Sequence, residues 1–176
     1  SMLNCINGIY SPQEGSIAYN GEKLDKINPN FIARKGISRT FQNLALFKRM
    51  SVLDNILVGR RLHMSSNFLQ IAFQLPKARE EERVNREKCE ELIEFLEIQD
   101  IRNTPVGKLP YGLQKKVELG RALATEAEVL LLDEPMAGMN VEEKREMCRF
   151  ILKVNDEIGT TMVLIEHDMG VVMDIS

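Results

Sequence analysis

The chain has 176 residues, of which 44% are hydrophobic and 28% charged, and this composition is typical of one globular domain or a large part of one. The formal net charge of −3 gives no electrostatic reason to expect a nucleic-acid partner, and no stretch approaches the roughly 18 apolar residues that cross a bilayer. Three cysteines without metal-type spacing and the lack of a secretory leader favour a reducing, cytosolic setting.

The first fifty residues predict short, mixed elements. Residues 3–10 carry apolar side chains at a helix-like spacing and end before Ser11-Pro12. Residues 15–21 alternate apolar and polar side chains and close with Asn20-Gly21, which predicts a hairpin or the end of a strand.

A second pair of elements follows directly. Residues 30–35 predict a short helix capped by Asn30. Residues 36–42 alternate again and predict a strand that leaves Gln42 at its end.

From Ser51 the sequence becomes helical. Ser51 followed three residues later by an acid is close to a capping-box pattern, so a helix begins there. Residues 77–97 predict a long charged helix, and its Arg/Glu run is most simply a solvated face with ion pairs one turn apart. A loop rich in Pro and Gly over residues 103–112 then leads into a helix over residues 113–125.

The stretch Val129–Pro135, Val-Leu-Leu-Leu-Asp-Glu-Pro, dominates the last third of the chain. Four consecutive apolar residues suit a strand buried on both faces of a parallel sheet. Asp133 and Glu134 follow where the apolar run ends, so we expect both carboxylates at the carboxyl end of the strand. Ligands of open α/β sheets collect in the crevice at that end.

A second buried strand follows one helix later. Residues 141–158 predict an amphipathic helix that ends at Gly159, and residues 161–165 predict a strand that delivers Glu166, His167 and Asp168 at its carboxyl end. A last helix begins near Asp168. The pattern is a βαβ unit with polar residues at its ligand-binding edge, and it predicts an α/β fold.

Taken together, five motifs resemble the ATP-binding subunit of an ABC transporter. One such motif is weak evidence, but five in the family's order are strong evidence. They are Thr-Phe-Gln-Asn around Gln42, Leu-Pro-Tyr-Gly-Leu-Gln at 109–114 (the signature loop), Leu-Leu-Leu-Asp-Glu-Pro, Ala-Gly-Met-Asn at 137–140, and Ile-Glu-His-Asp at 165–168. Leu-Pro-Tyr-Gly in place of Leu-Ser-Gly-Gly, Arg39-Thr-Phe-Gln-Asn and a long insertion over 60–83 resemble the subgroup that serves importers of branched-chain amino acids.

The resemblance implies a fold and a division of the chain. The fold is a P-loop NTPase-like (RecA-like) parallel sheet core with an inserted helical subdomain, truncated at both ends. Residues 1–50 and 126–176 would form a partial nucleotide-binding core, and residues 51–125 the helical subdomain with the signature loop.

The resemblance also implies roles in binding and hydrolysing ATP with Mg²⁺. Asp133 would bind Mg²⁺ through water, and Glu134 would be the general base for the attacking water. Gln42 would touch the metal and the water and report the nucleotide state to membrane subunits. His167 would contact the γ-phosphate.

Further residues would bind nucleotide. Tyr111, Gly112 and Leu113, at the start of a helix, would clamp the ATP of a second subunit, because N–H groups at a helix N-terminus favour phosphate. Asn140 would lie in the loop that crosses to that subunit, and Ser1 would directly follow the phosphate-binding loop of the family. Pro110 and Leu113 depart from the usual Ser and polar residue of the signature loop, and Pro supplies no N–H.

The largest departure is the phosphate-binding loop, because no Gly-Lys-Ser or Gly-Lys-Thr occurs in the chain. The backbone N–H groups and the Lys that neutralise the β- and γ-phosphates would therefore be missing. We expect weak ATP binding and no hydrolysis by these residues alone. We also expect self-association, because a strand of the family's sheet would be missing and its neighbours exposed.

Three readings remain. The first is an ATPase subunit that pairs with a second ATP-binding subunit, works with transmembrane permease subunits, and lies on the inner face of the plasma membrane. The second is a non-catalytic interaction module that docks on membrane subunits or on itself through the apolar residues Phe68, Leu69, Ile71 and Phe73. The third is an ABC-type ATPase outside transport, which would normally bring two cassettes or a coiled-coil insertion.

Overall fold

The computed structural model describes residues 2–24, 28–40, 45–65 and 75–175. Its centre is a parallel sheet of β3 (Ile37–Arg39), β4 (Val129–Asp133) and β5 (Thr161–Ile165), with β4 in the middle. Leu131 of β4 is in register with Arg39 on one side and with Val163 on the other. The α/β fold with a parallel sheet, predicted from the sequence, is confirmed.

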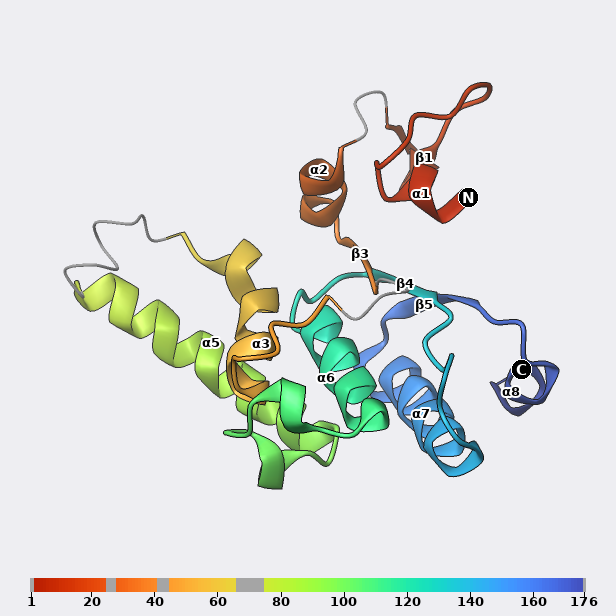
Figure 1. Ribbon diagram of the computed structural model, residues 1–176. Helices are drawn as coiled ribbons and strands as arrows, with labels where there is room; N and C mark the ends of the chain where they lie inside the picture. Colours follow the sequence, from red (N-terminus) through yellow and green to blue (C-terminus); the bar gives the residue numbers. More distant parts are fainter. Residues whose placement is uncertain (1, 25–27, 41–44, 66–74, 176) are drawn as a thin grey trace.

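Alternate residues of β4 face two different cores, as expected for a strand covered on both sides. Leu130 and Leu132 belong to the larger core, which also contains residues of α6 (Tyr111–Leu123) and α7 (Val141–Lys153). Leu131 belongs to a smaller core with residues of the N-terminal helices α1 (Met2–Ile6) and α2 (Pro29–Arg34). In Figure 1, α1 and α2 lie above the sheet, whereas α6 and α7 lie below it.

The N-terminal elements match the predictions in kind and differ in their ends. α1 ends at Ile6 rather than Tyr10, because Gly8 (φ 74°) leaves the helical conformation. A hairpin of β1 (Ala18–Tyr19) and β2 (Glu22–Lys23) turns at Asn20 and Gly21, whose positive φ angles of 50° and 77° suit a type I′ turn.

The predicted cap of α2 is wrong by two residues. Asn28, not Asn30, is the N-cap, and its Oδ1 accepts a hydrogen bond of 2.9 Å from Phe31 N. Pro29 then occupies the first helical position, where its fixed φ suits the helix and its missing N–H costs nothing.

Residues 51–125 contain mostly helices. Ser51 caps α3 as predicted, accepting a 3.1 Å hydrogen bond from Asp54 N. α6 begins at Tyr111 instead of residue 113, directly after Pro110. The described elements of this region, besides α6, are α3 (Val52–Gly59), α5 (Pro76–Phe95) and the 3₁₀ turns η1 (Arg60–His63), η2 (Gln99–Ile101) and η3 (Val106–Lys108).

The C-terminal part follows the predicted βαβ pattern with one local change. The helix expected over 141–158 is α-helical only to Lys153, and η4 (Val154–Ile158) continues it as a π-helical turn up to Gly159 (φ 75°). α8 (Met169–Ile175) is the last helix. β5 is an edge strand of the described sheet, and its Val163 is 37% exposed.

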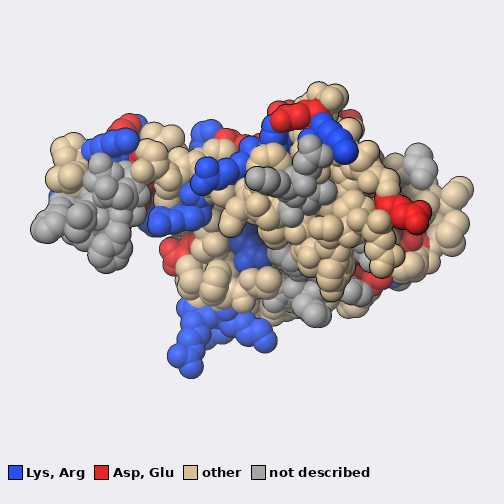
Figure 2. Space-filling view, turned by 90° about the horizontal axis from the view of Figure 1, so that it is seen from above, with Lys and Arg blue, Asp and Glu red and all other residues tan. Residues whose placement is uncertain are grey.

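Two general properties of the described residues are the distribution of surface charge and the length of the apolar helices. On the face shown in Figure 2, basic and acidic side chains are interspersed instead of forming one continuous basic surface. Among the described residues, no helix is long and apolar enough to span a bilayer. The apolar residues expected to form an exposed docking surface, Phe68, Leu69, Ile71 and Phe73, lie outside the described residues.

Candidate active site at the carboxyl ends of the strands

The carboxyl ends of β4 and β5 bring two of the predicted catalytic residues into contact. Because the two strands are parallel and Asp133 pairs with Ile165, the residues that follow them share one edge of the sheet. His167 Nε2 lies 3.2 Å from Glu134 Oε1. The imidazole is largely solvent-exposed, whereas the carboxylate is 25% exposed, so this pair faces outward from the sheet edge.

Glu134 has an unusual backbone conformation for a residue with a side chain. Its φ of 49° lies in the left-handed region, and its N–H donates to Ile165 O at 2.9 Å, which extends the β4–β5 ladder by one residue. Non-glycine residues held in this region carry a conformational cost and occur disproportionately at functional sites. The left-handed turn directs the chain away from the sheet immediately after Asp133.

Neighbouring residues fix the two turns on either side of this pair. Glu166 Oε1 accepts a hydrogen bond of 3.0 Å from Met136 N, which ties the loop after β4 to the loop after β5. Asp168 accepts from Lys144 Nζ at 2.6 Å and from Gly170 N at 3.0 Å. The hydrogen bond from Lys144 is the main reason that the pKa of Asp168 lies below its ordinary value.

Asp133 is paired with a cation from the neighbouring strand. Arg39 Nη2 lies 2.5 Å from Asp133 Oδ2, and Arg39 Nη1 donates to Asn4 Oδ1 at 2.5 Å. The position of Asp133 therefore already accommodates positive charge. The alternating pattern of residues 36–42 did not predict this role of Arg39, although it placed Arg39 in a strand.

Without nucleotide, the described donor set would hold Mg²⁺ only weakly. No cluster of three metal-binding side chains exists among the described residues. Mg²⁺ is commonly held by one or two carboxylates together with waters and substrate phosphates. Asp133 is the carboxylate at this edge that directly ends β4 and that we consider for such a site.

The signature loop lies apart from the strand ends. The first turn of α6, with Tyr111, Gly112 and Leu113, is at the far end of that helix from the sheet (Figure 1). The first N–H groups of a helix have no intrahelical acceptor, so they are available to an anion. Within one chain, the structure does not bring these residues to Glu134 and His167.

Tyr111 instead lies against the loop that leads to Asn140, and Gly112 lies against the first turn of α7. A Cβ on Gly138 would lie 3.2 Å from a ring carbon of Tyr111, and a Cβ on Gly112 would lie 2.4 Å from Glu143 Oε1. Asn140 and Glu143 cap α7 reciprocally: Asn140 Oδ1 accepts from Glu143 N and Glu143 Oε2 accepts from Asn140 N, each at 2.9 Å. The start of α6 and the start of α7 therefore form one surface.

Two predicted site residues, Ser1 and Gln42, lie outside the described residues. The structure shows a groove of about 380 Å³ between β3 and the helical region, and Thr40 and Ala45 are among the residues that line it. Phe47, Val58 and Leu62 line it, and they are 52%, 39% and 45% exposed. Sequence periodicity did not predict this groove, because its walls come from three separate segments.

A parallel α/β sheet with acidic residues and a histidine at its carboxyl edge, joined to a helical region, is the architecture of an ATP-binding cassette. The chain belongs to the ABC transporter family, whose model matches residues 1–137. It is 39% identical over 176 residues to the high-affinity branched-chain amino acid transport ATP-binding protein BraF of Pseudomonas aeruginosa, covering 100% of this chain and 69% of that protein. It is 33% identical to LivG of Escherichia coli K12, again over 100% of this chain and 69% of the relative.

Solved structures agree with this assignment to the ABC ATPases. A nucleotide-free ATP-binding cassette from an ABC transporter superposes with a TM-score of 0.81 at 29% identity, covering 99% of this chain and 68% of the other. A cassette in its ADP conformation gives a TM-score of 0.80 at 29% identity, covering 99% and 67%. The family resemblance and the fold predicted from the sequence are confirmed.

Proposed function

We propose that this chain is part of the ATP-binding and ATP-hydrolysing subunit of an importer for branched-chain amino acids. The substrate class is supported by the ranking of the relatives by sequence identity. BraF and LivG are 39% and 33% identical over the whole chain, whereas a sulfate/thiosulfate import protein, CysA of Synechocystis, is 30% identical. The signature loop Leu-Pro-Tyr-Gly agrees with this subgroup.

The chemistry that we assign to the site is hydrolysis of ATP by an activated water. Glu134 accepts the proton of the attacking water, and His167, 3.2 Å from its carboxylate, contacts the γ-phosphate. Asp133 would hold Mg²⁺ through water, and Gln42 would touch the metal and the water. Mg²⁺ would neutralise phosphate charge that develops in the transition state.

A second ATP-binding subunit would complete the site. Tyr111, Gly112 and Leu113 lie away from Glu134, so they cannot clamp a phosphate held at the strand ends of their own chain. We assign them, with Asn140 of the adjoining loop, to the nucleotide of the second subunit. Ser1 would lie beside the nucleotide of its own chain.

The groove at Phe47, Val58 and Leu62 supports a partnership with transmembrane permease subunits. It presents apolar side chains, and its lining residues Thr40 and Ala45 are close in the sequence to Gln42, the residue expected to report the nucleotide state. A short amphipathic helix of a permease suits a groove of this size and character. This partnership would place the subunit on the cytoplasmic face of the plasma membrane.

The 176 residues contain no phosphate-binding loop, so the catalytic role can be tested by adding one. A protein of these 176 residues is expected to bind ATP with Mg²⁺ more weakly than the micromolar range. We would therefore compare it with a version that carries a Gly-x-x-x-x-Gly-Lys-Ser loop ahead of Ser1, and measure ATP binding and turnover in both. Glu134→Gln is the test variant, and Glu142→Gln, an exposed acid on α7, is the matched control.

The expected result is that the extended protein binds ATP and hydrolyses it. Glu134→Gln should then lose turnover by about 10² to 10⁴-fold with ATP binding retained, as is typical of a lost general base. Glu142→Gln should hydrolyse ATP like the parent. Unchanged turnover in Glu134→Gln would refute the role of Glu134, and no ATP binding in the extended protein would favour the non-catalytic interaction module instead.

A further inference from the structure

Arg39 makes a contact that the assigned roles do not use. Its side chain is 8% exposed and that of Asp133 is 17% exposed, so the ion pair between them at 2.5 Å lies mostly out of water. Through its other terminal nitrogen, Arg39 donates to Asn4 Oδ1 of α1. A single guanidinium therefore joins α1, β3 and β4 immediately behind the candidate active site.

The sheet geometry explains why Arg39 reaches Asp133. Arg39 is in register with Leu131, and Asp133 lies two residues further along β4, on the same face of the sheet. The long side chain of Arg39 extends along the strand direction to the carboxylate. Arg39 Nε is buried and has no hydrogen-bond partner among the described residues. The guanidinium is therefore oriented so that its two terminal nitrogens make hydrogen bonds while Nε makes none.

The charge balance of this pair matters because neither partner is well solvated. A buried carboxylate that loses its counter-ion is left with a desolvation cost and no compensating attraction. Arg39 thus compensates the charge of the Asp133 carboxylate and holds it oriented at the sheet edge when no other cation is present. Arg also presents two donors in a fixed plane, which a Lys cannot do.

We propose that Arg39 is a positioning residue and the resident counter-ion of Asp133, and that divalent cations compete with its guanidinium for that carboxylate. The competition with Mg²⁺ rests on the proposed function, whereas the positioning of Asp133 does not. Because Asn4 shares the same guanidinium, the competition would also change how α1 is attached to the sheet edge. In this role Arg39 acts through Asp133.

The first test is a double-mutant cycle in the 176-residue chain without nucleotide or divalent cations. Arg39→Met should lower the melting temperature by about 6–10 °C, because Asp133 is left buried and unpaired. Arg39→Met with Asp133→Asn should recover at least half of that loss. Arg34→Met, at an exposed position on α2, is the matched control and should melt like the parent.

The second test asks for a readout that a purely structural ion pair would not change. Mn²⁺ serves as the probe and is titrated by electron paramagnetic resonance without nucleotide. Arg39→Met should bind Mn²⁺ about tenfold more tightly than the parent, since a competing unit charge has been removed from the carboxylate. Arg39→Met with Asp133→Asn should lose this gain.

Arg39→Lys keeps a positive charge, and it replaces Arg39→Met as the test variant if Arg39→Met does not fold. It should melt between the parent and Arg39→Met, because Lys cannot bridge Asn4 and Asp133 in one plane. Strictly additive melting shifts in the cycle would overturn the positioning role. Equal Mn²⁺ affinity in the parent and in the Arg39 variants would overturn the competition. A failure of Glu134→Gln to lose turnover affects the proposed function alone, because neither test here uses ATP.

Discussion

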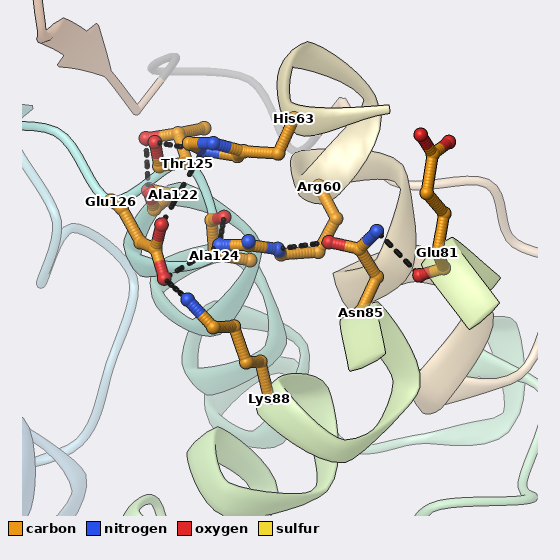
Figure 3. A network of polar contacts seen from close by, with 9 residues as sticks. All are labelled: Arg60, His63, Glu81, Asn85, Lys88, Ala122, Ala124, Thr125 and Glu126. Atoms are coloured by element: carbon orange, nitrogen blue, oxygen red, sulfur yellow. Dashed lines mark hydrogen bonds and ion pairs between the residues drawn. The ribbon is translucent and has the colours of Figure 1, made fainter. Parts of the chain in front are cut away.

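Arg60 connects three separate segments of the helical region (Figure 3). Its replacement tests how much its buried hydrogen bonds stabilise the packing of these segments. The guanidinium comes from η1, and its side chain is only 4% exposed. Its Nε donates to Asn85 Oδ1 of α5 at 2.8 Å, and its Nη1 donates to Ala124 O at 3.0 Å. The same Nη1 lies 2.9 Å from Glu126 Oε1, which also pairs with Lys88.

The magnitude follows from the acceptors that would lose their donor. In Arg60→Met the apolar stem remains, but Asn85 Oδ1 and Ala124 O each lose a charge-assisted hydrogen bond in a buried position. An unsatisfied buried acceptor costs about 1–3 kcal/mol, so the two together cost about 2–6 kcal/mol. The contact with Glu126 adds little, because that carboxylate is 44% exposed and keeps Lys88 as a partner.

The assay is thermal unfolding followed by circular dichroism. A loss in the middle of that range, about 4 kcal/mol, corresponds to a melting temperature lower by about 8–16 °C for a chain of this size. The matched control is Arg83→Met on the exposed face of α5, where Arg83 pairs with Glu80 and Glu87 in solvent. If Arg60→Met and Arg83→Met melt together, the buried hydrogen bonds of Arg60 do not fasten the helical region.

Three further predictions concern packing, pH and association. Gly59→Ala should lower the melting temperature more than Gly120→Ala, because a Cβ at Gly59 would lie 2.2 Å from a backbone oxygen of α6, whereas one at Gly120 first meets flexible side-chain ends; thermal unfolding compares the two. Burial alone would raise the pKa of Glu126, but hydrogen bonds from Lys88 and Arg60 outweigh it and lower the pKa, so the charged form stabilises the fold above the unfolded pKa of about 4.3 and this contribution is lost as pH falls further. Denaturant unfolding between pH 6 and pH 3 should therefore show a smaller loss of stability in Glu126→Gln than in the parent. Val163→Lys should reduce self-association in light scattering, because a charge on the exposed edge strand β5 opposes pairing between chains, and a parent that stays monomeric at high concentration would contradict this.

Sequence patterns predicted the parts of the fold that depend on local periodicity. The strand at residues 161–165 has the predicted bounds, and the apolar run that begins at Val129 is β4. The contact between Glu134 and His167 could also be anticipated, because parallel neighbouring strands deliver their ends to one edge of a sheet. The positions of Glu134 and His167 directly after two neighbouring parallel strands were sufficient to predict that they lie at the same edge of the sheet.

Element ends were predicted less well where neighbouring residues compete for the same role. Asn28 and Asn30 are both good caps, and Pro29 between them decides for Asn28 because it suits only the first helical turn. The change from α-helix to a π-helical turn at Val154 has no comparable local sign. Val154 is buried there, so the packing of that side chain against the larger core accompanies the change.

The contacts that could not be predicted are those made by long charged side chains across the fold. Arg39 and Asp133 are 94 residues apart in the sequence, and Arg60 and Ala124 are 64 apart. A strand pattern fixes the face of the sheet on which Arg39 lies. It does not fix which acceptor the guanidinium reaches, because several rotatable bonds separate the guanidinium from the backbone. Both arginines are nevertheless almost completely buried, and a buried cation requires a partner. An arginine at the end of an alternating strand is therefore a reason to search for a carboxylate on the neighbouring parallel strand. That carboxylate is expected two residues beyond the register partner of the arginine, toward the carboxyl end of the strand.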